Sequence, residues 1–160
     1  MNENLLTALQ DQFNMERQNA AIYDALAAQL DAVHWPGASA WMKRAADEER
    51  QHADKFSGYI VDRNGVPQFA GLVPVVAPQE TDDLVLFFDA AMGREQLTTE
   101  AIKALHVLAD EAEDPQTCAF LIWFLEEQTK SEREITDILL MLNRLDNNGR
   151  VVFDETLGEA

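Results

Sequence analysis

The scarcity of proline and glycine constrains the fold of this sequence more than any other feature. The 160 residues include only 5 prolines and 7 glycines, and most of these fall at residues 36–37, 65–78, 115 and 149. The segments between these breaks are rich in Ala, Leu, Glu, Gln and Met, which favour helix. The pattern therefore predicts four helices of roughly 45 Å each. They cover about residues 4–33, 37–64, 81–113 and 115–147.

Residues that commonly cap helices support these boundaries. Thr81 precedes two aspartates and is expected to begin the third helix, and Asp114-Pro115 is expected to begin the fourth. Asn148-Gly149 is expected to end the fourth helix. Residues 151–160 then form a tail long enough for one or two turns of a short fifth helix.

The lengths of the connections predict the topology. Residues 34–36 and Asp114 allow only tight reversals, so the first and second helices form one antiparallel hairpin and the third and fourth form another. Residues 65–80 carry three prolines and two glycines, and when extended they reach about 53 Å, the length of a helix. We predict an all-α, four-helix bundle in one domain, residues 1–160, with this long crossover loop between the second and third helices. The loop valines that could lie against the helices are Val66, Val73, Val75 and Val76.

Each predicted helix has an apolar stripe that polar residues interrupt near the middle. Steps of three and four residues keep one face of a helix toward a bundle core. In all four helices the ends of this stripe are apolar, whereas the middle is not. The interrupting residues near the midpoints are Glu16, Glu49, Glu95 and Gln128, with His52 one turn after Glu49. Packing the helices side by side therefore brings these polar groups to one level.

Converging carboxylates need a positive partner inside an apolar bundle. Burying three glutamates together would cost roughly several kcal/mol for each, unless they are protonated or neutralised. The stripes contain no Lys or Arg, so a metal ion is the simplest source of charge. Carboxylates with one imidazole suit iron or manganese, and a single cysteine excludes a thiolate zinc site.

The spacing of the polar residues suggests how two metal ions would be held. Glu16, Glu49 and His52 can hold one ion, and Glu49 can bridge to a second ion held by Glu95. The Glu-x-x-His spacing alone is a weak signal, because a sequence this rich in glutamate produces it by chance. Tyr23 lies two turns from Glu16 on the same face. It is a one-electron donor, a hydrogen-bond partner or a core aromatic residue.

The charge of the chain restricts its partners. With 12 Lys and Arg against 29 Asp and Glu, the formal net charge is −17. Such a surface repels phosphate backbones and anionic membranes and attracts cations. The first residues lack the features of an export signal, and the longest apolar run, residues 118–125, is too short to span a bilayer. We expect a cytoplasmic protein without nucleic-acid or membrane partners.

Four short motifs resemble those of the bacterial non-haem ferritins, over essentially the whole chain. They are residues 14–16 with Tyr23, residues 47–52, residues 94–96 and residues 123–128. The resemblance implies a ferroxidase centre in which Glu16, Glu49 and His52 bind one iron and Glu49 and Glu95 the other, with Gln128 and Tyr23 beside them. It also implies a homo-oligomeric shell of 24 subunits. The shell would oxidise Fe(II) with dioxygen or hydrogen peroxide and store the ferric product.

The sequence departs from related families at several positions. Arg50 stands where haem-binding bacterioferritins have a methionine, so we predict no haem. Glu48 and Glu127 are available for a third iron position, but Lys130 stands where an acid is often found. We therefore expect that position to be weak or absent. Ser131, in place of an acid, leaves the second iron with fewer ligands.

Two other interpretations remain open. A rubrerythrin-like di-iron peroxidase or oxygenase would be expected to have a second Glu-x-x-His motif and often a Cys-rich module, and this sequence has neither. A metal-free helical interaction module would require the central acids to be protonated or to reach solvent. Mini-ferritins that coat DNA are disfavoured by the acidity of the chain.

Overall fold

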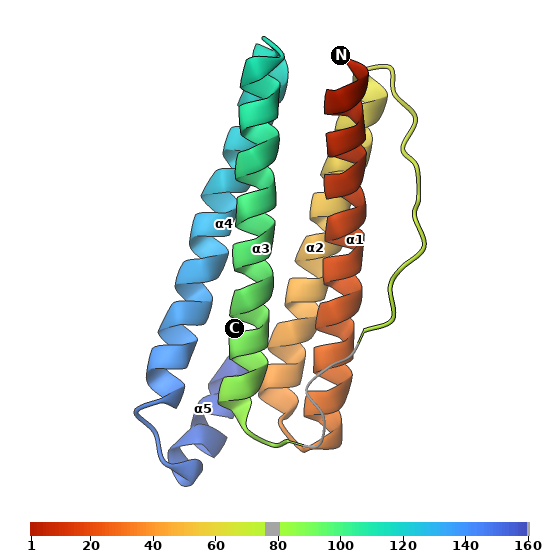
Figure 1. Ribbon diagram of the computed structural model, residues 1–160. Coiled ribbons are helices and arrows are strands. Elements are labelled where there is room, and N and C mark those ends of the chain that lie inside the picture. Colours follow the sequence, from red (N-terminus) through yellow and green to blue (C-terminus); the bar gives the residue numbers. More distant parts are fainter. Residues whose placement is uncertain (76–80, 160) are drawn as a thin grey trace.

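The computed structural model describes residues 1–75 and 81–159, and these residues form five helices without a strand (Figure 1). Two helical hairpins and a short C-terminal helix make up the fold, which confirms the predicted class. The helices are α1 (Glu3–Ala32), α2 (Pro36–Asp62), α3 (Leu84–Glu111), α4 (Pro115–Leu142) and α5 (Asn147–Glu159).

Two predicted helix ends are wrong. Helix α3 begins at Leu84 because Asp83 is its N-cap and accepts from the backbone N–H of Val85, so Thr81 lies before the helix. The fourth helix stops at Leu142, and Asn148-Gly149 lies inside α5 instead of ending α4. Asn148-Gly149 is helical because the side chain of Asp146 accepts from the N–H of Gly149 at 2.8 Å and so caps the start of α5.

The first three helices end in the same way. The second residue after each helix has a positive φ, 65° at His34, 61° at Asn64 and 52° at Glu113. The next N–H then turns back to the last helical turn, as when Trp35 N–H donates to the carbonyl of Leu30 at 2.9 Å. This local motif reverses the chain within a few residues, which explains the tight connection in each hairpin.

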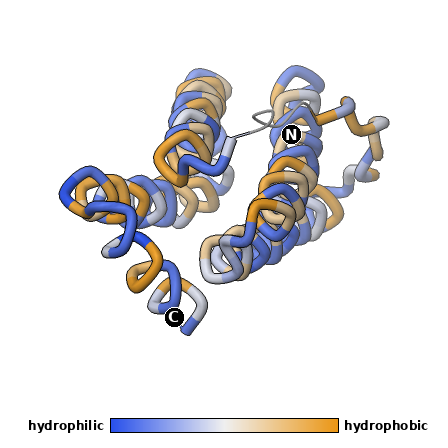
Figure 2. Tube along the Cα trace, turned by 90° about the horizontal axis from the view of Figure 1, so that it is seen from below, coloured by the Kyte–Doolittle hydropathy of each residue, from blue (hydrophilic) through white to orange (hydrophobic). Residues whose placement is uncertain are grey.

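The crossover segment runs along the outer side of the hairpin formed by α1 and α2 (Figures 1 and 2). Amide side chains of α1 hold it. Gln18 donates to the carbonyl of Val73 at 3.0 Å and accepts from the Val73 N–H at 2.8 Å. Gln10 likewise donates to the carbonyl of Val66 and accepts from the N–H of Gln68, both at 2.8 Å. The expected apolar anchoring is wrong for Val66 and Val73, which are 75% and 68% exposed. Val76 and the end of the loop lie outside the described residues.

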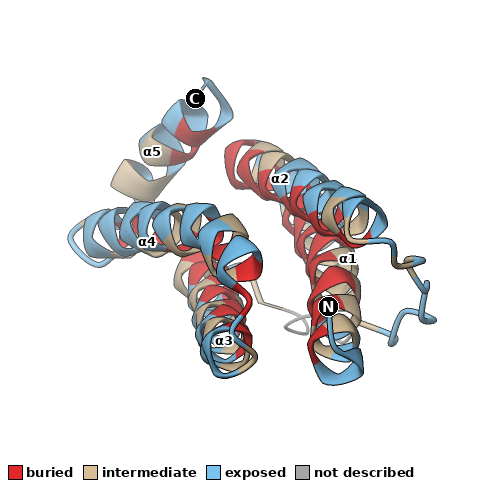
Figure 3. Cartoon of the chain, turned by 90° about the horizontal axis from the view of Figure 1, so that it is seen from above, coloured by how far each residue is buried: buried red, intermediate tan, exposed pale blue. Residues whose placement is uncertain are grey.

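The core consists of two apolar clusters, one toward each end of the bundle. Buried residues line the sides of the four long helices that face one another (Figure 3). One cluster includes Leu30, Met42 and Phe88, and the other includes Leu9 and Phe56. Between the clusters lies the layer of polar side chains that the interrupted stripes predict.

Helix α5 packs beside the start of α2 and caps it. The Asp154 carboxylate accepts from the backbone N–H groups of Gly37, at 2.9 Å, and Ala38, at 2.7 Å. A Cβ atom at Gly37 would lie 1.7 Å from the carbonyl oxygen of Asp154, so glycine is required at this contact. Among the described residues, every helix is too short or too polar to cross a lipid bilayer.

Candidate metal centre

The predicted polar residues occupy the interior of the bundle. Glu16 comes from α1, Glu49 and His52 from α2, Glu95 from α3, and Gln128 from α4. Their exposed fractions are 0% for Glu16, 4% for Glu49, 7% for His52, 3% for Glu95 and 2% for Gln128. Each helix places its polar residue inward because that residue continues the apolar stripe on either side of it.

Three of these residues form a group suited to a metal ion. One ligand atom each from Glu16, Glu49 and His52 lies within 4.8 Å of the other two. His52 Nδ1 is 3.7 Å from Glu49 Oε2, as expected for residues three apart on one helix face. Two carboxylates and one imidazole are hard and intermediate donors that suit Fe(II) or Mn(II).

The buried acids are not equivalent in protonation. Burial raises the pKa of Glu16 well above its ordinary value, and the neighbouring Glu49 raises it further. Burial also acts to raise the pKa of Glu49, but its interactions with His52 and Glu16 outweigh burial and the pKa is lowered. Burial and the charge of Glu49 raise the pKa of Glu95 to about 7. Without metal, protons on Glu16 and Glu95 therefore relieve the repulsion that a bound cation would otherwise relieve.

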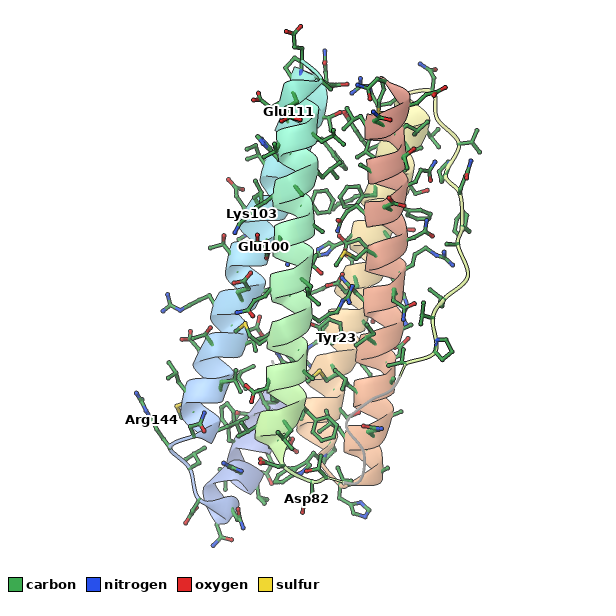
Figure 4. All side chains as sticks on the ribbon, in the orientation of Figure 1. Tyr23, Asp82, Glu100, Lys103, Glu111 and Arg144 are labelled. Carbon is green, nitrogen blue, oxygen red and sulfur yellow. The ribbon has the colours of Figure 1, made fainter. Side chains whose placement is uncertain are left out.

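Glu95 is held by two hydrogen bonds from different helices. The Tyr23 hydroxyl donates to Glu95 Oε1, and Gln128 Nε2 donates to Glu95 Oε2 at 2.9 Å. Tyr23 lies between α1 and α3 (Figure 4), where burial and the charge of Glu95 raise the pKa of its phenol. Tyr23 is thus a neutral hydrogen-bond donor that also contacts Trp41 edge-on. Of the roles predicted for Tyr23, the structure shows two, the hydrogen-bond partner and the core aromatic residue, while one-electron donation stays a prediction.

A small cavity adjoins the carboxylates on the side of α4. Its volume is about 20 Å³, enough for about one water molecule. The polar residues that line it are Tyr23, Glu48, Glu49, Glu95, Ser131 and Glu134. Burial and the charge of Glu134 raise the pKa of the half-buried Glu48. Glu127 instead forms an ion pair with the exposed Lys130, at 2.5 Å.

Sequence reasoning missed the amide groups that surround Glu16. Gln12 Nε2 donates to Glu16 Oε1 at 2.7 Å, and Asn19 Nδ2 lies 3.3 Å from Glu16 Oε2. Both residues are buried. Their spacing of four before and three after Glu16 puts them on its helix face, a signal available in the sequence. Arg94, which donates to Asn19 Oδ1, gave no such signal because it lies outside the stripe of α3.

Fold and site together define a helical bundle whose core brings together carboxylates and a histidine that could hold a metal ion. The sequence profile of the ferritin-like domain family matches residues 6–145, so the chain belongs to this family. It is 32% identical to the "Bacterial non-heme ferritin" of Staphylococcus aureus (strain USA300) over 99% of this chain and 95% of that protein. The protein of the same name from Staphylococcus saprophyticus is also 32% identical, over 96% and 90%.

Solved structures agree with this assignment. An open pore ferritin from the hyperthermophilic archaeon Archaeoglobus fulgidus superposes with a TM-score of 0.95 and 27% identity, covering 100% of this chain and 99% of that one. A closed form of the same archaeal ferritin, engineered by mutagenesis, superposes with a TM-score of 0.95, 27% identity and coverage of 100% and 98%. The bundle, the crossover and α5 are therefore the ferritin fold, as the sequence predicts.

Proposed function

We propose that this protein is an iron-storage ferritin that oxidises Fe(II) at the buried centre and deposits the ferric product inside a protein cage. The observation that carries the proposal is the convergence of Glu16, Glu49 and His52 within 4.8 Å, deep in the bundle. Membership of the ferritin-like family and the identity to bacterial non-heme ferritins support it.

In this proposal iron is the substrate, and the residues have separate tasks. Glu16, Glu49 and His52 bind the first Fe(II), while Glu95 and the second oxygen of Glu49 bind another. Gln128 and Tyr23 orient Glu95 through the hydrogen bonds described above. Two Fe(II) ions supply two electrons to dioxygen, which with two protons leaves as hydrogen peroxide. Hydrogen peroxide is the alternative acceptor of the same two electrons.

The surroundings of the centre support further parts of the proposal. Glu127 is engaged with Lys130, so a third iron position built from Glu48 and Glu127 is expected to be weak or absent. On the surface, Arg50 of α2 forms ion pairs with Asp24 of α1 and Asp47 of α2, and we propose that the protein binds no haem. We also propose a cage of 24 subunits, whose net charge of −17 per chain would attract Fe(II).

The test is to add Fe(II) in air to the metal-free protein and to follow both absorbance and particle size. We expect a rapid absorbance change from ferric iron, followed by a mineral that co-elutes with a large protein particle. A protein that elutes as a monomer or dimer would contradict the cage. Rapid turnover of peroxide without retained mineral would instead favour the rubrerythrin-like alternative.

A second experiment separates the proposed function from the metal-free interpretation. Burial of Glu16 and Glu95 contradicts the version in which the acids reach solvent, whereas their raised pKa values are compatible with the version in which they are protonated. Calorimetric titration with Fe(II) under anaerobic conditions is expected to show saturable binding. The absence of any binding at neutral pH would favour the metal-free module.

A further inference from the structure

Asn19 is a buried amide that lies against two of the acids at once. It is 0% exposed and sits one helical turn after Glu16 on α1. Its Nδ2 is 3.3 Å from Glu16 Oε2 and 3.2 Å from Glu49 Oε2, so one amino group reaches carboxylates on two helices. An amide NH₂ has two hydrogens, which Asn19 shares among these two carboxylates and the hydroxyl of Thr98. Asn19 thereby links α1 and α2 at the level of the metal site.

Arg94 determines which way the Asn19 amide points. Its Nε donates to Asn19 Oδ1 from α3. A guanidinium group has donors only, so the oxygen of Asn19 must face Arg94 and the nitrogen must face the acids. Thr98 on α3 adds an acceptor for the same nitrogen, with its Oγ1 at 3.0 Å. The contacts on both sides of the amide therefore agree on one orientation.

This arrangement opposes the separation that repulsion would cause once both carboxylates are ionised, as metal ligands must be. Glu16 and Glu49 share a dry interior and repel one another when both are ionised. A donor held between them draws both toward one point before any cation is present. Ligands that are already in place make metal binding less costly, because less order has to be created at that moment. The Asn19 amide has no free lone pair directed at the acids, so it does not ligate the metal itself.

We propose that Asn19, oriented by Arg94, is a positioning residue that holds Glu16 and Glu49 in the metal-binding arrangement in the metal-free protein. The inference rests on the proposed function, since it concerns the same centre. It goes beyond that function because it assigns Asn19 of α1 and Arg94 of α3 a role in metal binding that is separate from iron oxidation.

The experiment is an anaerobic titration of the metal-free protein with Co(II), which reports coordination through its visible spectrum and does not depend on turnover. Asn19→Leu keeps the branched shape of the side chain and removes the donor. We expect its Co(II) affinity to fall roughly 10-fold, as is usual when a group that orients metal ligands is lost, and its visible bands to shift. The matched control is Gln18→Leu, which removes an adjacent amide bound to the crossover segment and should keep the native affinity and spectrum.

A second pair of variants keeps the inference testable if Asn19→Leu does not fold. Arg94→Met leaves Asn19 in place but frees its amide, and we expect an affinity loss of about 3-fold with a partial spectral shift. Arg94→Lys retains a donor for Asn19 Oδ1 and should restore most of the native behaviour. Native affinity and spectrum in Asn19→Leu, or in Arg94→Met, would overturn the inference while leaving the proposed function intact. Failure of the unaltered protein to bind Co(II) or Fe(II) would overturn both.

Discussion

The two halves of the polar layer are built differently. On the side of α1 and α2, Glu16 and Glu49 already converge with His52, and amide donors brace them. On the side of α3 and α4, Glu95 is tied to Tyr23 and Gln128, and the space beside it is a small cavity where Ser131 supplies a hydroxyl in place of an acid. A buried acid must lose a proton in each half, Glu16 in the first and Glu95 in the second, but only in the first half do the ligand atoms already converge. The difference predicts that the first position fills before the second.

The largest effect is expected from removing the acid that both halves share. Glu49→Gln keeps the shape of the side chain but removes the charge that serves both positions. We expect the initial rate of Fe(II) oxidation to fall by about 100-fold or more. The control is Glu100→Gln, an exposed residue of α3 that pairs with Lys103 on the surface. Stopped-flow absorbance compares the three proteins, and an oxidation rate within threefold of the native rate in Glu49→Gln would show that Glu49 is not shared.

Variants that alter one half at a time should weaken Fe(II) binding at different positions. Glu95→Gln is expected to leave the first Fe(II) bound with near-native affinity while lowering the second affinity by about 10-fold. Glu16→Gln should weaken the first position by a similar factor. Anaerobic calorimetry with Fe(II) resolves the two events. Equal losses in both variants at both positions would contradict the proposed inequality of the two halves.

The stability of the metal-free protein and its affinity for the second metal ion should depend on pH in opposite directions. The folded protein raises the pKa of Glu95 from 4.5 to about 7, so between these values the native state binds more protons than the unfolded state. The metal-free protein should therefore lose stability as pH rises toward 7, on the order of 1 kcal/mol per pH unit. Affinity for the second metal should rise over the same range, because binding releases the proton. Thermal unfolding and Fe(II) titration from pH 5.5 to 8 check the opposite trends. Glu95→Gln should flatten the trend in second-metal affinity and reduce the trend in stability, to which the raised pKa of Glu16 also contributes.

The smallest effect is expected from Tyr23. Its hydroxyl lowers the pKa of Glu95 by donating to the carboxylate, so Tyr23→Phe should move the pH midpoint of second-metal binding upward. The loss of one such hydrogen bond corresponds to about 1 kcal/mol, or roughly fivefold in affinity. Tyr59→Phe is the matched control, because the Tyr59 hydroxyl contacts Thr117 and Arg63 away from the centre. A midpoint that does not move, or moves downward, would show that Tyr23 does not assist ionisation of Glu95.

The sequence predicted the helices and the polar layer because both depend on local periodicity. A stripe of residues at steps of three and four identifies the buried face of a helix without its partners, and Glu16, Glu49, Glu95 and Gln128 were found in this way. The ends of the helices were harder to predict than their existence. The third helix begins at Leu84 because Asp83 caps it, and Asp83 competed in the sequence with Thr81, which is also a good cap.

Periodicity could not predict the polar contacts that join different parts of the fold. The donation from Arg94 to Asn19 joins α3 to α1, and the carboxylate of Asp154 caps α2 from the far end of the chain. The crossover was expected to pack through its valines, but the amides of Gln10 and Gln18 hold its backbone instead. A long polar side chain can satisfy many possible partners, and only packing selects one of them.

By itself the sequence determined that four long helices form, that they pair as two hairpins, and that acids with one histidine meet at mid-height in an acidic chain. These properties follow from residue type and spacing along the backbone, which folding does not change. Only the tertiary structure decided that Glu16, Glu49 and His52 converge while Glu95 turns to Tyr23 and Gln128, and that Asn19 stands between the first two acids. Those relations depend on the rotation and height of each helix against its neighbours, which are set by the packing of the whole core.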